Sequence, residues 1–168
     1  MKVLTVLVPT YNVEKYLRRC LDSLLLPEVL EEIEVLVVND GSKDGSADIA
    51  RAYEKKYPQT VVFVDKENGG HGSTINVGIE KAQGTYFKVL DSDDWVNIGD
   101  FIEFVKRLKE ETADAVICDY RKEHVYNGKS EYFEYKDLED GKKYNLNEID
   151  LNICLLYTSP SPRDLSTS

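Results

Sequence analysis

The sequence predicts an α/β fold, with a doubly wound and mostly parallel sheet between layers of helices. Short apolar runs with the length of strands alternate with amphipathic helical segments through the first two-thirds of the 168 residues. Strands separated by helices form right-handed crossovers, which place the strands side by side and parallel. The hydrophobic fraction of 42% is sufficient for the core of one domain.

The predicted strands are short, mainly apolar runs, and residues 2–8 form the continuous run expected where helices cover both faces of a sheet. They are residues 2–8, 33–38, 61–64, 86–90 and 115–118. The predicted helices carry apolar residues at intervals of three and four. They are residues 13 to about 26, 46 to about 57, 73–82 and 98 to about 110. Asn12 and Ser46 are expected to cap two of these helices, and Gly84 to end a third.

The pattern changes after residue 119. Residues 121–126 and 131–135 flank Asn127-Gly128-Lys129. Asn-Gly is the favoured centre of a tight hairpin turn, so a β-hairpin is expected here.

The charge balance excludes some classes of partner. The chain has 31 acidic and 21 basic residues, for a formal net charge of −10. Nucleic-acid binding depends on clustered cations, so neither a nucleic acid nor an anionic membrane surface is an expected partner. A small anionic ligand fits if a divalent cation neutralises it.

The sequence also predicts a cytoplasmic location. No apolar stretch approaches the ~20 residues of a membrane-spanning helix, and the N-terminus lacks the features of a signal peptide. Cys20, Cys118 and Cys154 are an odd number without metal-ligand spacing, which fits reduced thiols.

Ligands of open α/β sheets bind outside the carboxyl ends of the strands. The segments that follow the predicted strands are therefore the candidate site. They are Pro9-Thr10-Tyr11-Asn12, residues 39–44, residues 66–72 and residues 91–95.

The acidic segment is the candidate metal site. Asp91 and Asp93 point the same way if the strand continues, and Mg²⁺ or Mn²⁺ often bridges one or two carboxylates to substrate phosphates. A solvated acidic turn that caps the next helix is the alternative interpretation.

The other three segments suit a nucleotide. Tyr11 could stack on a base, and Asp40 could accept from a ring N–H or from ribose. The glycines of Glu67-Asn68-Gly69-Gly70-His71-Gly72-Ser73 permit close approach to a diphosphate. Each segment is also consistent with an ordinary turn or helix entry.

Taken together, these segments resemble family 2 glycosyltransferases. The similarity covers about residues 2–119 and rests on five motifs in the family's order. They are residues 8–12, 38–46, 68–79, 82–86 and 90–95. The resemblance is to bacterial members that build surface polysaccharides or decorate wall polymers.

The resemblance implies a GT-A fold, a nucleotide-sugar donor such as a UDP-sugar, a Mg²⁺ or Mn²⁺ cofactor, and transfer with inversion to a saccharide or lipid-linked acceptor. Asp93 would be the principal metal ligand, supported by Asp91 and Asp94. The implied nucleotide-sugar contacts are Pro9, Thr10, Tyr11, Asp40, Asn68, Gly69, Asp91 and Ser92.

Two departures from the family pattern matter. Many relatives carry Arg where Ile75 stands, and Lys66 or His71 could replace it at the diphosphate. The family's catalytic base lies downstream, in the acceptor-binding half, so the base is expected beyond this chain. Glu139, Asp140 and Asp150 are available carboxylates without the expected context.

These departures predict residues 1–153 as a catalytic domain truncated before the acceptor half, with any contact to the inner face of the membrane made by the missing part. Residues 154–168 resemble translated sequencing-adapter DNA and are expected to be a non-native, disordered tail. A sugar nucleotidyltransferase and a non-enzymatic receiver-type module are the alternative functions.

Overall fold

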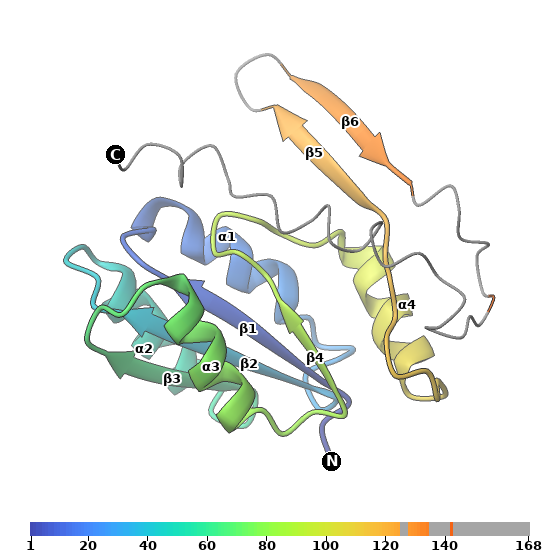
Figure 1. The fold of residues 1–168 in the computed structure, drawn as a ribbon, viewed down its shortest axis with the longest axis horizontal. Coiled ribbons are helices and arrows are strands. Elements are labelled where there is room, and N and C mark those ends of the chain that lie inside the picture. Colours follow the sequence, from blue (N-terminus) through green and yellow to red (C-terminus); the bar gives the residue numbers. More distant parts are fainter. Residues whose placement is uncertain (125–127, 135–141, 143–168) are drawn as a thin grey trace. The chain divides into compact units, whose positions relative to one another are not determined.

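The computed structural model describes residues 1–124, 128–134 and 142. The chain divides into two units, Met1–Thr112 and Ala113–Ser168, and each is described by itself. Within the described residues, the first unit contains a parallel sheet with its helices, and the second contains a hairpin (Figure 1).

The sheet of the first unit confirms the predicted fold class. Its strands are parallel in the order β3-β2-β1-β4. Their bounds are β1 (Leu4–Thr10), β2 (Ile33–Asp40), β3 (Val61–Lys66) and β4 (Tyr86–Val89). Every residue of β1 and β2 is buried, including the polar Glu34, Asn39 and Asp40 of β2. Both strands end two residues later than predicted, so Thr10 and Asp40 belong to the sheet.

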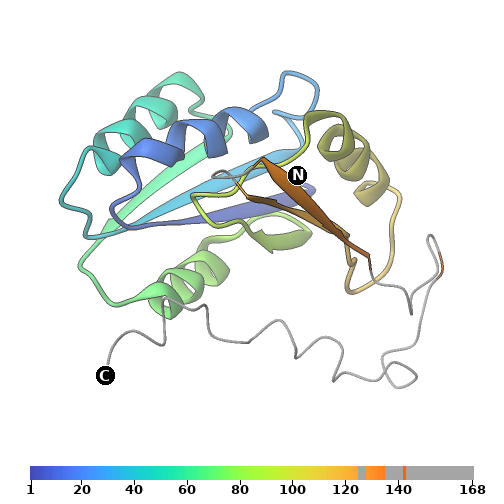
Figure 2. The same cartoon turned by 90° about the horizontal axis from the view of Figure 1, so that it is seen from above.

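Helices cover both faces of this sheet. Figure 2 shows α1 (Glu14–Leu24) and α2 (Ser46–Lys56) on one face and α3 (His71–Lys81) on the other. The larger core cluster joins the α1 and α2 face to α4 (Ile98–Leu108), through residues such as Leu21, Ile49 and Val105. A smaller cluster forms around Leu7, Leu36 and Val38, with partly buried Ile75 of α3 packed against it.

Two predicted helix caps are wrong. Asn12 has a left-handed backbone with φ of 52°, and its side-chain oxygen accepts from the Lys43 amide (2.8 Å) instead of from its own helix. Ser46 is the first residue of α2 rather than its cap, and its hydroxyl accepts from the Val13 amide (2.9 Å). Both side chains bind a loop about thirty residues away in sequence, which a local pattern cannot indicate.

The predicted role of Gly84 is also wrong. The C-cap of α3 is Ala82, and Gly84 lies beyond it, against the first residues of β1. The Gly84 amide donates to Thr5 Oγ1 (2.9 Å), and a Cβ at this position would lie 2.4 Å from the Thr5 nitrogen. Close approach to a buried strand, not helix termination, therefore requires glycine here.

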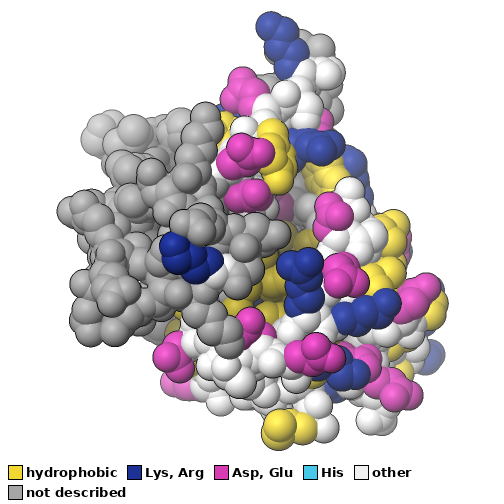
Figure 3. All heavy atoms as spheres, turned by 90° about the vertical axis from the view of Figure 1, so that its right-hand side faces the viewer, with side chains coloured by type: hydrophobic (Ala, Val, Ile, Leu, Met, Phe, Trp, Pro, Cys, Tyr) yellow, Lys and Arg dark blue, Asp and Glu magenta, His cyan; other side chains and the backbone are white. Residues whose placement is uncertain are grey.

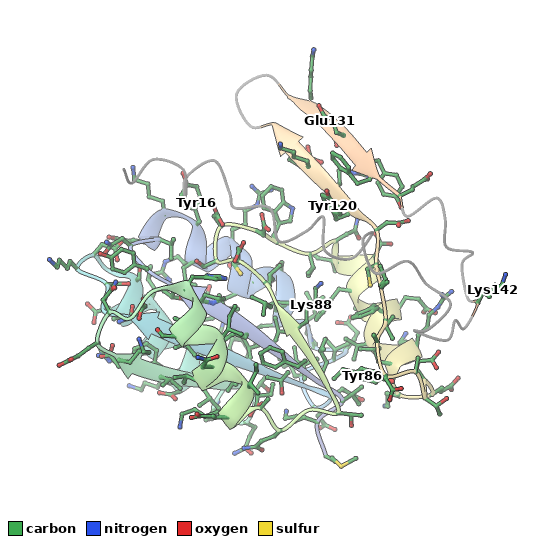
Figure 4. All side chains as sticks on the ribbon, viewed as in Figure 1. Tyr16, Tyr86, Lys88, Tyr120, Glu131 and Lys142 are labelled. Atoms are coloured by element: carbon green, nitrogen blue, oxygen red, sulfur yellow. The ribbon has the colours of Figure 1, made fainter. Side chains whose placement is uncertain are left out.

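The second unit contains the predicted hairpin, but not the predicted fifth strand. Residues 115–118 are not in a strand, and Val116 and Ile117 are exposed. The strands are instead β5 (Tyr120–His124) and β6 (Lys129–Phe133), which pair antiparallel. Figure 4 labels Tyr120 on β5 and Glu131 on β6. The Tyr120 and Phe133 rings stack with centroids 4.8 Å apart, a cross-strand contact that favours this register.

Acidic and basic side chains are interspersed on the face drawn in Figure 3. Exposed ion pairs of the first unit include Arg107–Glu103 (3.5 Å) and Lys109–Glu32 (2.9 Å). Such surface pairs contribute at most about 1 kcal/mol each, so the core clusters dominate stability.

Some predictions fall outside the described residues. These are the tail at residues 154–168, the turn residue Asn127 and the carboxylates Glu139, Asp140 and Asp150. In the described part of the chain, no helix combines the length and hydropathy needed to cross a membrane.

Candidate functional site

The order of the strands locates the candidate site. The chain moves from β1 outward through β2 to β3, and then returns to add β4 on the other side of β1. In doubly wound sheets, ligands bind at the carboxyl edge where the order reverses. Here the segments that follow β1 and β4 flank this point, and Val89 of β4 is in register with Leu7 of β1.

The end of β1 presents one aromatic ring. Pro9 and Thr10 are buried in the strand, and the Thr10 hydroxyl donates to the Val8 carbonyl (3.1 Å). Tyr11 follows and is 49% exposed. Of the nucleotide contacts predicted in this segment, Tyr11 is therefore the one whose side chain is available to stack on a base.

The loop after β1 is cross-linked to the loop after β2. The amide of Asn12 donates to Ser42 Oγ (3.0 Å). The amide of Glu14 donates to Asp44 Oδ2 (3.1 Å), and Glu14 Oε2 accepts from the Gly45 amide (3.0 Å). Together with the Asn12–Lys43 and Val13–Ser46 hydrogen bonds, these contacts fix Tyr11 relative to the end of β2.

Asp40, the last residue of β2, binds the glycine loop. Its Oδ1 accepts from the Gly69 amide (2.9 Å) and from Lys66 Nζ, and its Oδ2 accepts from the Gly70 amide (2.8 Å). The Asn68 side-chain amide donates to the Asp40 carbonyl (3.0 Å). The structure thus brings together three of the predicted nucleotide contacts, Asp40, Asn68 and Gly69.

The ionisation of Asp40 follows from these partners. Burial by itself raises the pKa of the Asp40 carboxyl, but the hydrogen bonds from Lys66 and from the Gly69 and Gly70 amides outweigh it, so the pKa is lowered. The carboxyl is therefore an anionic acceptor at neutral pH.

Of the two suggested replacements for the missing arginine, Lys66 is already engaged in the glycine loop. Lys66 Nζ donates to Asp40, to the Glu67 carbonyl (2.6 Å) and to Ser73 Oγ (2.9 Å), which uses its three hydrogens. His71 is exposed at the first position of α3. Ile75 packs against the small core cluster on this side of the sheet, which accounts for an apolar side chain there.

The acidic segment forms a turn after β4. The Asp94 amide donates to the Asp91 carbonyl (2.9 Å), and Ser92 between them is buried. Partial desolvation is the largest cause of a raised pKa at Asp94, followed by the charges of Asp93 and Asp91. Lys88, which lies on β4 (Figure 4), partly offsets these effects.

Residues of helix α1 contact this turn and the residues that follow it. The Cys20 thiol donates to the Asp91 carbonyl (3.8 Å), and Ser23 Oγ accepts from the Val96 amide (3.2 Å). The Arg19 guanidinium carbon lies 3.3 Å from the centroid of the Trp95 ring. These supports were not predicted, because the contacting residues are more than seventy positions apart and neither segment carries a local signal for them.

A divalent cation fits the donor set of this turn. Carboxylate oxygens are the ligands that Mg²⁺ and Mn²⁺ prefer, and a cation would neutralise the charges of Asp93 and Asp91 that add to the effect of burial on the pKa of Asp94. Across residues 1–124, 128–134 and 142, no group of three His, Cys, Asp or Glu side chains forms a ready-made metal site. Substrate phosphate oxygens would have to complete the coordination of a metal ion bound here. The assignment of Asp91, Asp93 and Asp94 as its ligands stays a prediction.

Relatives with curated descriptions share most of this chain. The putative glycosyltransferase EpsH of Bacillus subtilis is 41% identical over 126 residues, which are 75% of this chain and 36% of EpsH. Glycosyltransferase GlyA of Streptococcus pneumoniae is 38% identical over 118 residues, 70% of this chain and 16% of GlyA. The chain therefore spans little more than a third, or less, of the length of these relatives.

Solved structures share the fold. S. aureus TarS 1–349 in complex with UDP-GlcNAc superimposes with a TM-score of 0.56 at 34% identity, covering 66% of this chain and 32% of TarS. The mannosyltransferase PcManGT from Pyrobaculum calidifontis, in complex with GDP-Man and Mn²⁺, gives a TM-score of 0.55 at 27% identity, covering 61% of this chain and 31% of that one. A model of glycosyl transferase family 2 matches residues 5–157. The sheet order, the motifs at its carboxyl edge and these matches agree that the chain belongs to glycosyltransferase family 2.

Proposed function

We propose that this chain is the donor-binding part of an inverting, metal-dependent glycosyltransferase that uses a UDP-sugar. The observation that carries the proposal is the clustering at one sheet edge of an exposed aromatic ring, a buried carboxylate bound to a glycine loop, and an acidic turn. The UDP-GlcNAc complex of TarS supports the choice of donor. The family match favours glycosyl transfer over nucleotidyl transfer or a receiver module.

Each donor-binding residue has a role that its surroundings permit. Tyr11 would stack on the base, since it is half exposed beside the reversal point of the sheet. Asp40 would accept the ring N–H of uracil, because the carboxyl is ionised and Oδ2 accepts one hydrogen bond in the free chain. Pro9, Thr10, Asn68 and Gly69 would form the backbone walls around these two groups.

The acidic turn would bind the diphosphate end of the donor. Asp93 would hold the divalent cation together with Asp91 and Asp94, and Ser92 would contact the sugar-nucleotide. When bound, Mg²⁺ or Mn²⁺ would neutralise charge on the departing diphosphate.

The transfer step needs a further carboxylate. It would take the proton of the acceptor hydroxyl while that oxygen bonds to the anomeric carbon and the bond to the diphosphate breaks, which inverts the configuration and releases UDP. Within the proposal, this base belongs to the acceptor-binding half. The acceptor is a saccharide or a lipid-linked saccharide, and its binding would bring the enzyme to the inner face of the membrane.

Calorimetric titration tests the donor assignment directly. The chain is titrated with UDP, and with ADP for comparison, in the presence and absence of Mn²⁺. We expect UDP to bind more tightly than ADP, and Mn²⁺ to strengthen the binding. Equal affinity for the two nucleotides, or no effect of the metal, contradicts the corresponding assignment.

A further inference from the structure

We propose that Lys66 is a positioning residue for donor binding. Its ammonium group holds the Asp40 carboxylate and the glycine loop in the one arrangement that leaves an acceptor site on Asp40 for the base. The proposal deepens the proposed function and rests on it, because it takes Asp40 as the group that contacts the base.

Asp40 has one acceptor site left after its contacts with the described residues of the free chain. An ionised carboxylate offers about four lone-pair sites. Oδ1 accepts from Lys66 and Gly69, and among the residues that the structure describes, Gly70 is the one that donates to Oδ2. The side chain of Asp40 is only 5% exposed, so its partners hold it in place. The remaining site is therefore on Oδ2, and an incoming ring N–H would find its acceptor already oriented.

The Lys66 ammonium lies in a closed network of hydrogen bonds. Besides Asp40, it binds the Glu67 carbonyl and Ser73 Oγ. Ser73 Oγ in turn donates to the carbonyl of Gly70, whose amide binds Asp40 (2.7 Å and 2.8 Å). Because all three ammonium hydrogens are used inside this network, Lys66 acts through Asp40 and the loop rather than on the diphosphate.

Gly69 and Gly70 leave the space that this network needs. A Cβ at residue 69 would lie 3.1 Å from Lys66 Nζ and 2.8 Å from Ser73 Oγ. Gly70 has φ of 82°, in the left-handed region that favours glycine. The two glycines therefore let the loop turn its amides toward Asp40 while the ammonium lies against the loop.

Electrostatics gives Lys66 a second effect. Lys66, at the end of β3, is the charged side chain that lowers the pKa of Asp40. The other hydrogen bonds that lower this pKa come from the uncharged amides of Gly69 and Gly70. Burial raises the pKa of Asp40, and the loss of Lys66 would leave that effect less opposed. A protonated Asp40 would present an O–H donor to the N–H donor of the uracil ring, so the hydrogen bond between them would be lost.

The test compares four variants of the full 168-residue chain. Lys66→Met removes the charge, Lys66→Gln keeps a hydrogen-bond donor without charge, and Lys66→Arg keeps the charge. Ser73→Ala removes one partner of the ammonium without touching Asp40. Two readouts are followed against pH: the ¹³C chemical shift of the Asp40 carboxyl in the free protein, and the UDP affinity measured by calorimetry.

We expect Lys66→Met and Lys66→Gln to raise the pH at which Asp40 titrates and to weaken UDP binding by about tenfold at neutral pH. Loss of UDP binding on acidification should begin at a correspondingly higher pH. In Lys66→Arg, Asp40 should titrate at the same pH as in wild type, and most of the UDP affinity should be kept. In Ser73→Ala, the pH at which Asp40 titrates should be unchanged. Use of both Met and Gln keeps the test valid if one of them does not fold.

An unchanged Asp40 titration in both uncharged variants overturns the proposal, even if their UDP affinity falls, because the loss would then be merely structural. Unchanged UDP affinity with a shifted titration overturns it as well. The titration needs no nucleotide, so it is independent of donor binding. Failure of the wild-type chain to bind UDP would refute the proposed function instead.

Discussion

Replacing Gly84 with alanine should destabilise the protein strongly, although the change adds a single methyl group. The backbone of Gly84 is not in the left-handed region, so alanine can adopt it without conformational strain. The difficulty is space, since the new Cβ would lie 2.4 Å from the Thr5 nitrogen and 2.7 Å from the Leu4 carbonyl carbon. These are backbone atoms of the buried central strand β1, paired on both sides, and they cannot move aside cheaply.

The expected size of the effect follows from two losses. Overpacking at a rigid site costs about 1–3 kcal/mol. Displacement of Gly84 also weakens its hydrogen bond to Thr5 Oγ1, which costs about 0.5–1.5 kcal/mol. The sum is about 1.5–4.5 kcal/mol, and for a chain of this size it corresponds to a decrease in Tm of roughly 3–18 °C.

Thermal unfolding followed by circular dichroism measures this change, with Gly72→Ala as the matched control. Gly72 is in the first turn of α3, and a Cβ there meets nothing within 4 Å, so alanine should be neutral or slightly stabilising. UDP affinity of the folded Gly84→Ala protein should be nearly unchanged, because residue 84 precedes β4 and the acidic turn follows it. A Tm within a degree or two of the control would refute the steric reasoning.

Three further predictions concern ionisable groups. Asp93→Asn should abolish the effect of Mn²⁺ on UDP affinity. Asp48→Asn is the control, because this side chain is 89% exposed on α2, and it should keep the effect. An identical metal response in both variants contradicts the metal assignment. Folding lowers the pKa of Asp40 from its ordinary 3.8, so its contribution to stability is present above that pH and is lost as the pH falls below it. In urea unfolding between pH 2 and 6, the free energy of unfolding should therefore depend less on pH for Asp40→Asn than for wild type. Burial, followed by the neighbouring acidic charges, raises the pKa of the Cys20 thiol to about 12, so peptide mapping after alkylation at pH 8 should find Cys20 unmodified until the protein unfolds.

The sheet and the residues at its carboxyl edge could be predicted because they depend on short-range patterns. A run such as Leu4–Thr10 is mainly apolar and lacks strict alternation of apolar and polar residues, which indicates a strand covered on both faces. Once the strands are known, the rule for carboxyl ends places Tyr11, Asp40 and Asp91–Asp94 on one edge without further information.

The contacts within the site could not be predicted, because they join segments that are distant in sequence. Asp40 and Gly69 are 29 residues apart, and Cys20 and Asp91 are 71 apart. The misassigned strand at residues 115–118 has a different cause. A short apolar run has no periodicity to distinguish a strand from other structures, whereas the nearby hairpin has both a turn signal and the cross-strand Tyr120–Phe133 pair.

The cross-linked loops after β1 and β2 have a consequence for exchanging specificity between homologues. Suppose that residues 9–14 alone replace the matching segment of another family member. Asn12 then loses its contact with the Lys43 amide, and the Glu14 amide loses its contact with Asp44, because residues 43 and 44 are not transferred. The start of α1 would then lose partners that its own segment does not provide, since Val13 at the N-cap forms no side-chain cap. Residues 9–14 and 42–46 are therefore the smallest unit that can be transplanted, and chimeras built from one loop should fold less well than chimeras that carry both.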